Sequence, residues 1–564
     1  MRKQWMGILA FALTGAPVMA NASAANCGAG DVPLVVSTNV TTNTTWSGTV
    51  ILQQPIFVKN GAILTILPGT IVRGQPRTAA VAAGVTAGTP GALIVTNNGR
   101  IIADGSPTNS IIMTTAAVDN NGPGGVGGPD GVPDNDDGNA FLDPWAPGDL
   151  FLDNNCGTAP LAPLAADGTA NVNRWGGLVI SGNAPNNTAD GIFQVEGLTV
   201  PGFPLADAEC GGNEPHDNSG RLQYVSIRHA GDEIGNSNEL NGLTMCSVGD
   251  GTKISNVEVY ANFDDGFEWF GGTVNGDHLF VTFAGDDSFD IDLGYTGVNQ
   301  FLFTIQNFFD QDSGAAFGTG SSDKAGEWDG DNFDEGALDV CLRADGTPCP
   351  FPGADFFNLT VIGSTPDGAQ DSTSFDPTGA NRGPQIRHCG ASRLFNSVVL
   401  NTGTAEGFDV DGTMPGGTAC SAGHNVTDHT TAGYIALVCS TLDDVAALGA
   451  TETTASTNGN SLSLLLGAAA ASANSVNPAT FDIVNDDTTF DTVGVAGKLA
   501  ASLKTSPINP RLVTGGLGRP NAGCALPPSP LDTSAVYRGA FAIGAPSLWT
   551  TGWTALNQGG LLAN

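Results

Sequence analysis

The chain has 564 residues, of which 41% are hydrophobic, and a formal net charge of −36 at pH 7. Such a charge repels nucleic acid and anionic lipid and attracts cations, so it excludes a main role in binding either polyanion. The hydrophobic content and the 78 glycines predict a folded, loop-rich β protein rather than a disordered chain.

The N-terminal residues have the layout of a secretory signal peptide. Arg2 and Lys3 precede an apolar run that reaches Leu13, and small residues follow as far as Ala24. We therefore expect a signal peptide over residues 1–24 and an exported mature chain. All ten cysteines follow this segment, and an even number in an exported chain favours disulfides. No later stretch is apolar for long enough to predict a transmembrane segment.

From about residue 34 to residue 440 the sequence consists of short β-branched and aliphatic runs separated by Gly, Asn, Asp or Pro. This pattern predicts short strands joined by turns. We expect two strands around a Pro-Gly turn within 62–72, and further strands at 92–95, 100–103 and 110–113. Their spacing of eight to ten residues is the length of one side of a β-solenoid with its corner.

An acidic phrase that begins at Asp264 returns at Asp286, 22 residues later, and a shorter echo covers residues 406–412. A repeat of this length is too short for a domain and matches one coil of a solenoid. Equivalent residues of stacked coils lie about 4.8 Å apart. The alternation of side chains predicts an inward column and an outward column, formed by Phe267, Phe289 and Phe408 and by Glu268, Asp290 and Asp409 respectively.

Several segments resemble one large family of exported bacterial proteins with a pectin-lyase-like, right-handed parallel β-helix. Besides the acidic repeat, they are 64–70, 175–180, 224–231, 241–244, 537–541 and 549–554. The resemblance implies an all-β fold: a single-stranded right-handed parallel β-helix, or solenoid, with long loop insertions. It further implies a location outside the cell, at the outer-membrane surface or in the periplasm, and an extracellular polysaccharide or cell-envelope component as partner.

The same pass along the chain predicts its organisation. The solenoid should cover residues 25–440, with an Asp/Gly-rich insertion at 118–155. An Ala/Ser/Thr-rich insertion is expected at 441–510, and a C-terminal segment that packs on the solenoid at 511–564.

The first insertion contains a run of aspartates from residue 128 to 138 that resembles the calcium loop of a thrombospondin type 3 repeat. The resemblance implies a Ca²⁺ site whose ligands include Asp130, Asp134, Asp136 and Asp137.

The acidic repeat predicts a second Ca²⁺ site. Two carboxylates about 5 Å apart repel by roughly 1 kcal/mol in water, and by several times more where the dielectric falls. No Lys or Arg lies between residues 254 and 323, and His278 is the only basic candidate there. A hard cation that takes six to eight oxygen ligands relieves this repulsion. The expected ligands are Asp264, Asp265, Glu268, Asp286, Asp287, Asp290 and Asp292, with Asp310 and Asp312 as a possible extension.

A hydrated acidic face screened by salt is the alternative interpretation of this repeat. In that case the carboxylates need no bound metal, and the phenylalanines beside them are simply core.

The first functional hypothesis is a secreted or cell-surface, calcium-stabilised β-helix that is glycan-binding or structural. Phe270 has outward parity and is a candidate sugar-stacking ring, with Arg228 and His229 as candidate ligand-binding residues. For the two basic residues, a charge-pair role within an acidic protein is the competing interpretation.

The alternative hypothesis is an enzyme, a polysaccharide lyase or glycoside hydrolase, on the same scaffold. Its basic residue would be Arg228, His229, Lys253 or the pair Arg387 and His388. The Gly-His-Gly turn and the Arg-x-Lys element of β-helical pectin hydrolases are both missing, which weakens the hydrolase case.

Overall fold

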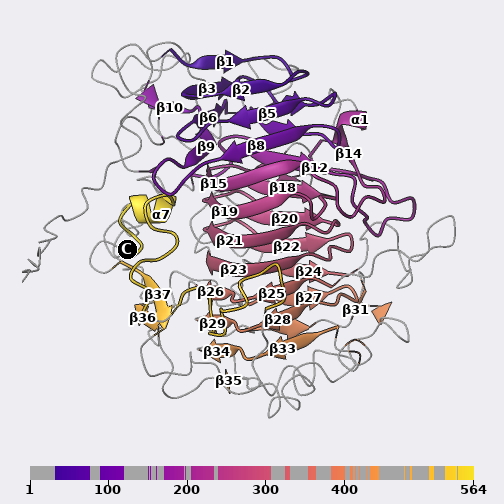
Figure 1. Cartoon of the computed structure of the whole chain (residues 1–564), viewed down its shortest axis with the longest axis vertical. Helices are drawn as coiled ribbons and strands as arrows, with labels where there is room; N and C mark the ends of the chain where they lie inside the picture. The colour runs from indigo at the N-terminus through magenta and orange to yellow at the C-terminus, as the bar shows by residue number, and fades with distance from the viewer. Residues whose placement is uncertain are drawn as a thin grey trace, which may run out of the picture.

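Two long parallel sheets contain most of the strands that the structure, a computed structural model, describes (Figure 1). The structure describes residues 32–76, 89–119, 150–151, 153, 160–161, 171–195, 197–198, 205–233, 239–306, 324–330, 353–363, 383–400, 407–410, 413–414, 418–419, 429, 432, 434–443, 475–476, 483–485, 507–512, 527–542 and 544–564. The sequence-predicted signal peptide, the aspartate loop at 128–138, and Asp310 and Asp312 lie outside these residues.

The nine-stranded sheet forms one face of the solenoid, and every neighbour in it pairs in parallel. Its strands, from the N-terminal to the C-terminal end, are β4 (Ile56–Val58), β7 (Leu93–Val95), β12 (Leu178–Ser181), β18 (Leu243–Cys246), β20 (Phe267–Phe270), β22 (Phe289–Asp292), β24 (Glu327–Asp329), β27 (Gln385–Arg387) and β30 (Asp409–Val410).

The 18-stranded sheet supplies two further faces. One face is made by β2 (Thr44–Trp46), β5 (Ile63–Ile66), β8 (Arg100–Asp104), β25 (Asp355–Phe357), β28 (Arg393–Phe395) and β33 (Ala436–Val438). The other is made by β1 (Leu34–Val36), β3 (Thr49–Leu52), β6 (Ile71–Gly74), β9 (Ile111–Thr115), β26 (Thr360–Ile362), β29 (Val398–Leu400), β34 (Thr441–Asp443) and β35 (Ser475–Val476). Four long strands contribute to both faces, namely β15 (Gly220–Arg228), β19 (Lys253–Tyr260), β21 (Asn275–Thr282) and β23 (Val298–Ile305).

One coil therefore runs from a strand of the nine-stranded sheet through both faces of the larger sheet and back. The coil from β20 through β21 to β22 shows this, because Phe267 pairs in register with Phe289 of the next coil. The parallel β-helix predicted from the repeat is confirmed, and strands β5 to β9 lie where the sequence predicts them. The handedness of the coil stays a prediction.

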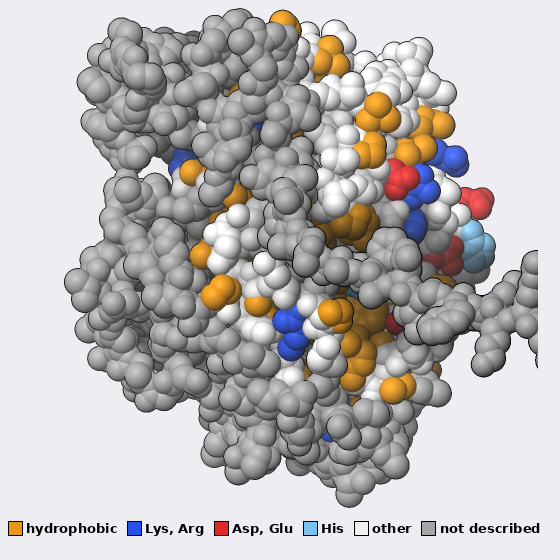
Figure 2. Space-filling view, turned by 60° about the vertical axis from the view of Figure 1, so that its left-hand side comes forward, with side chains coloured by type: hydrophobic (Ala, Val, Ile, Leu, Met, Phe, Trp, Pro, Cys, Tyr) orange, Lys and Arg blue, Asp and Glu red, His pale blue; other side chains and the backbone are white. Residues whose placement is uncertain are grey.

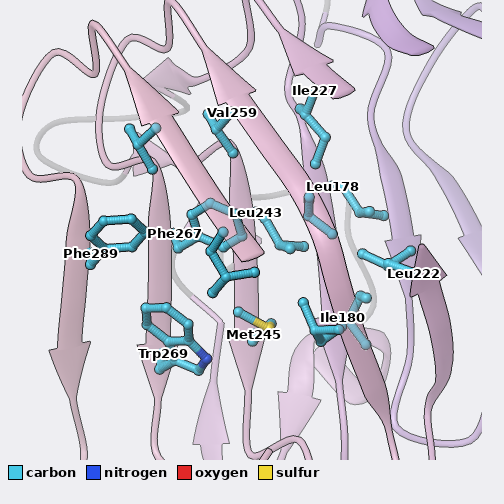
Figure 3. Close-up of a cluster of buried hydrophobic side chains, with 14 of the residues drawn as sticks. Leu178, Ile180, Leu222, Ile227, Leu243, Met245, Val259, Phe267, Trp269 and Phe289 are labelled. Atoms are coloured by element: carbon cyan, nitrogen blue, oxygen red, sulfur yellow. The ribbon is translucent and has the colours of Figure 1, made fainter. Parts of the chain in front are cut away.

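The core lies inside the coils, where alternate residues of every strand meet (Figure 3). Large rings stack within and between coils: Trp269 lies 5.8 Å from Phe267 of the same strand and 5.2 Å from Tyr295 of the next coil, measured between ring centroids. Phe267 and Phe289 are stacked at 5.7 Å. Phe267 and Phe289 are thus inward, as the sequence predicts, and Phe408 is also buried in this core. The stack removes extensive apolar area from water, at about 25 cal/mol per Å².

Two outer clusters show that parts of the solenoid surface are covered. One contains outward residues of the nine-stranded sheet together with the hairpin of β13 (Phe193–Gln194) and β14 (Glu209–Cys210). The other lies between the larger sheet and the C-terminal residues 527–564, which contain the helix α7 (Ala555–Gln558). Figure 1 shows α7 in yellow beside the larger sheet, on the side away from β18 to β24.

The remaining elements are short. The helix α1 (Leu205–Ala208) precedes β14, and none of the described helices is long and apolar enough to cross a membrane. Four antiparallel pairs complete the described structure: β10 (Val118–Asp119) with β11 (Leu150–Phe151), β16 (Asp232–Glu233) with β17 (Glu239–Leu240), β31 (Thr413–Met414) with β32 (Thr418–Ala419), and β36 (Ile483–Asn485) with β37 (Asn509–Leu512).

Candidate cation site

The acidic repeat folds into two stacked strands because glycines let the coils approach closely. A Cβ on Gly266 would lie 2.7 Å from the carbonyl oxygen of Ser288 in the next coil, so a side chain there would force the coils apart. Gly271, just after β20, has a φ of +66°, a left-handed conformation that glycine adopts without strain. These two residues flank β20 and so place Glu268 between them.

A ladder of polar side chains precedes the strands of the nine-stranded sheet. The Oδ1 atom of Asn241 accepts a hydrogen bond from the backbone N–H of Asp265 at 3.1 Å. Asp265 Oδ1 accepts from the N–H of Asp287 at 2.8 Å, and Asp287 Oδ1 accepts from the N–H of Lys324 at 3.0 Å. Asp265 and Asp287 are therefore stacked one coil apart, as predicted, and each also bonds the backbone of the following coil.

The outward residues of β20 and β22 extend the acidic surface. Glu268 pairs in register with Asp290, and Phe270 with Asp292. Glu268 also accepts a hydrogen bond from the side-chain amide of Asn241. Farther along, Gln385 pairs with Asp409, which continues the column of Glu268 and Asp290 through β24 and β27 and confirms the predicted position of Asp409.

Two triads of carboxylates come close enough to share an ion. Single oxygen atoms of Asp264, Asp265 and Asp286 lie within 4.8 Å of one another, and so do single oxygens of Asp265, Glu268 and Asp290. Two ligands bound to Ca²⁺ at about 2.4 Å can be at most about 4.8 Å apart. Both triads thus fit the size of a calcium coordination shell, and they share Asp265.

Burial of these acids makes full ionisation unfavourable. Burial, with the nearby charges of Asp264 and Asp290, raises the pKa of Asp265 well above its ordinary value. Burial likewise raises the pKa of Asp287 and of Asp290. Burial and the charge of Asp329 raise the pKa of Asp292 to about 7. Such shifts mean that the cluster must hold protons or bind a cation near neutral pH.

One atom of the cluster is notable for its lack of partners. Oδ1 of Asp290 is shielded from solvent and accepts no hydrogen bond from any residue that the structure describes. A buried carboxylate oxygen without a donor is unfavourable by about 1 to 3 kcal/mol or more. It is available for a bound cation at the second triad.

Basic side chains reach this face from later coils. The sequence names Arg387 and His388 only as candidate basic groups of an enzyme, and the sequence reasoning missed Lys324. Lys324 and Arg387 both contact Glu327, Arg387 Nε lies 2.6 Å from Asp329 Oδ1, and His388 Nδ1 lies 2.7 Å from Asp329 Oδ2. The expectation that His278 is the only basic group near the acids is wrong, because stacking brings residues 324 and 387 beside residue 290. His278 instead pairs with Asp277 on the larger sheet.

A sequence signal for this extension was present. The alternation of acid, apolar and acid in Asp290, Ile291 and Asp292 returns in Glu327, Trp328 and Asp329, although the spacing there is longer. In the structure Ile291 pairs with Trp328, which aligns the two motifs.

The three residues predicted to bind a ligand are all buried in the structure. Phe270 is 3% exposed and stacks on Phe193 of the β13–β14 hairpin at 5.3 Å, and the disulfide from Cys210 to Cys246 joins that hairpin to β18. Phe270 does point out of the coil, but a covering element shields it.

Arg228 and His229 lie beneath other covering segments and are fully shielded from solvent. Arg228 donates to Ser226 Oγ and to Gln558 of α7, both at 2.8 Å. His229 Nδ1 lies 2.6 Å from the carbonyl oxygen of Asn171, so that nitrogen is the donor. Both residues therefore anchor covering segments instead of contacting a surface ligand.

These features define a class of protein: a parallel β-helix with covered apolar faces and one ionic outer face. The chain belongs to the family described as the pectate-lyase like beta helix domain, whose model matches residues 157–481. No curated protein matches the chain. The family match covers β12 to β35, which includes the whole acidic repeat.

Proposed function

We propose that the protein is an exported, calcium-stabilised β-helix that binds glycan at the cell surface or outside the cell. The observation that carries the proposal is the pair of carboxylate triads that share Asp265, one formed just before β20 and β22 and the other reaching the outward residues Glu268 and Asp290 of these strands. A divalent ion there would replace protons on acids whose pKa values burial has raised.

Export is supported by the signal-peptide pattern and by the cystines. Cys210 and Cys246 form a disulfide, and Cys389 and Cys439 are also disulfide-bonded. Disulfides persist in oxidising compartments and are rare in the cytosol. The calcium loop at 128–138 lies outside the described residues and stays a prediction.

The direct test is calcium titration of metal-free mature protein by calorimetry, together with thermal unfolding with and without chelator. We expect saturable binding and a higher unfolding temperature with calcium, because a ligand that binds only the folded state stabilises it. The control is Asp250→Asn, which removes a carboxylate from the turn before β19, where Asp250 pairs with His216. An unfolding temperature unmoved by calcium would refute the proposal.

A second candidate function, polysaccharide lysis, is favoured by the position of Arg387. Its guanidinium lies on the same face as the triads, within hydrogen-bond distance of Asp329. A guanidinium beside a cation site can pair with the carboxylate of a bound uronate, which would make the neighbouring C–H proton easier to remove. Incubation with pectate and alginate, followed by the ultraviolet absorbance of unsaturated products, tests it. Activity that Arg387→Gln abolishes and Arg393→Gln leaves intact would establish the enzyme.

A further inference from the structure

A second surface feature lies where the long strands of the larger sheet bend between its two faces. One residue of each strand has a left-handed backbone there: Tyr224 (φ 50°), Asn256 (54°), His278 (56°) and Phe301 (59°). The strand pairing places these residues in one column, with Asn358 and Asn396 in the next coils. Asparagine adopts this conformation readily, whereas bulky residues do so at a cost of about 1 to 2 kcal/mol.

The three rings of this bend column continue into rings of the C-terminal segment. Tyr224 lies 5.6 Å from Trp553, which lies 6.4 Å from Trp549. His278 is 5.1 Å from Trp549 and 4.7 Å from Phe301, and Phe301 is 6.4 Å from Tyr537. The result is a continuous line of rings that crosses successive coils.

Four of these rings reach the surface. Tyr224, His278, Tyr537 and Trp549 are half-buried, whereas Phe301 and Trp553 are buried beneath them. We call the four half-buried rings the aromatic row. Tyr224 and His278 are two coils apart, which corresponds to about 10 Å, the scale of a disaccharide.

Polar groups flank the aromatic row. The carboxylate of Asp277 is 40% exposed, and it accepts a hydrogen bond from Ser255 and contacts His278 at 2.7 Å. Asp532 is exposed, and Gln223 is half-buried beside Tyr224. Ring faces for C–H groups together with acceptors for hydroxyls are what a sugar chain requires.

The surroundings of the row argue against other occupants. The most exposed large hydrophobic residues that the structure describes lie elsewhere in the sequence and do not include the row: Val32, Leu34, Val35, Leu67, Ile192, Leu205 and Tyr434. A protein partner would need a larger apolar patch. Asp277 and Asp532 would repel an acidic polymer. Figure 2 shows the side of the molecule that carries the C-terminal segment, where the described hydrophobic side chains (orange) come to the surface among white areas of other side chains and backbone.

We propose that the aromatic row binds a neutral polysaccharide chain that lies across the coils. The inference rests on the glycan-binding part of the proposed function and assigns it a site separate from the carboxylate triads. The sugar rings stack on Tyr224, His278 and Trp549, and Asp277 and Asp532 accept hydrogen bonds from hydroxyl groups. Binding at this site requires no calcium, since none of the triad carboxylates belongs to it.

Tyr224→Asn, His278→Asn and the double variant test the proposal. Asparagine suits the left-handed bend, as Asn256 shows within the same column, so these changes remove rings while preserving the backbone. His216→Asn is the matched control, because it removes an imidazole that is 83% exposed and lies outside the row. Asp265→Asn separates this site from the triads.

Binding is measured by calorimetry in chelator with neutral β-1,4-linked hexasaccharides of glucose, xylose, mannose and N-acetylglucosamine. We expect the wild type to bind at least one of them and the double variant to bind it at least tenfold more weakly. His216→Asn and Asp265→Asn should bind as the wild type does. If the double variant still binds the hexasaccharide as the wild type does, the aromatic row is not the binding site, although the protein does bind glycan. If no hexasaccharide binds, both this inference and the glycan part of the proposed function fall, whereas the calcium result is unaffected.

Folding is checked by circular dichroism and thermal unfolding. If the asparagine variants do not fold, tryptophan fluorescence of the wild type replaces them, because Trp549 lies in the row and Trp553 beneath it. A saturable change in emission on addition of the bound hexasaccharide supports the site. An unchanged emission at saturation would mean that the row only anchors the C-terminal segment.

Discussion

Replacing Asp265 by asparagine should raise the stability of the folded protein in chelator and lower it in the presence of calcium. The variant keeps the oxygen that accepts the N–H of Asp287, as Asn241 does one coil earlier, and loses only the charge. Charges 4.8 Å apart repel by about 3 kcal/mol at an effective dielectric of about 20, and by less than about 1 kcal/mol in water. Partial protonation relieves much of this, so we expect a gain of about 1 to 2 kcal/mol in chelator at pH 8.

Calcium should favour the wild type instead. An ion at one hundred times its dissociation constant contributes about 2.7 kcal/mol to the folded state. Asp265 belongs to both triads, so its neutralisation should remove most of this increment. The assay is the unfolding temperature of wild type, Asp265→Asn and Asp250→Asn, each in chelator and in calcium. The reasoning is refuted if Asp265→Asn lowers stability equally in both media, since Asp265 would then act only as a member of the hydrogen-bonded ladder.

Three further perturbations have defined outcomes. Burial and the charge of Asp329 raise the pKa of Asp292 to about 7. The contribution of this carboxyl to folding stability is therefore fully present below its unfolded pKa of about 4 and is lost as the pH rises through 7. In chelator the wild type should lose about 1 to 2 kcal/mol of folding stability over that range, and Asp292→Asn should show a flatter pH profile of unfolding. Arg387→Gln leaves Glu327 and Asp329 without their guanidinium partner and should cost about 1 to 3 kcal/mol by urea unfolding, more than Arg393→Gln, whose side chain is 42% exposed beside Asp355. Thr554 caps α7 by accepting from Asn557 N–H, so Thr554→Ala should cost about 1 kcal/mol locally and speed hydrogen exchange in 544–564 without changing exchange in β20 or β22.

The sequence predicts the stacking well because the period is regular at the acidic repeat. Phe267 and Phe289, and Glu268 and Asp290, pair as their 22-residue spacing requires. Strand alternation alone then determines that Trp269 points inward and Phe270 outward. The pairing follows from the 22-residue repeat, and the side-chain orientation follows from the two-residue alternation of a β-strand.

The sequence does not predict which outward residues are covered by other segments of the chain. Phe270 is outward yet buried, because residues 193–210 return to cover it through a hairpin and a disulfide. Arg228 is hidden by Gln558, which follows it by 330 residues. Such contacts depend on how the covering segments fold back onto the solenoid, and no repeat in the sequence encodes that arrangement.

The same limitation explains the misjudged charge balance. Counting basic residues within 254–323 treats neighbours in sequence as neighbours in space, whereas a solenoid makes residues of the next coil the nearest ones. Lys324 follows Asp287 by 37 residues and yet donates its backbone N–H to it. In that setting, burial alone would lower the pKa of Lys324, but the charges of Asp287 and Glu327 outweigh burial and raise it.

The outward residues of the nine-stranded sheet change from apolar to acidic along the solenoid, and this change distinguishes the covered scaffold from the candidate cation site. Its outward residues are apolar in the first coils, as Phe57, Ile94 and Val179 show, and these are covered. Beyond β18 the equivalent position holds Glu268, Asp290 and then Glu327. A stack of acids gains nothing for a core, and burial together with the charges of Asp287 and Asp329 raises the pKa of Asp290, so compensating charge stabilises the coils from β20 to β24. Arg387 and Lys324 supply it at one end of the stack, which leaves the Asp265 end, where the two triads meet, as the place where a divalent cation contributes most.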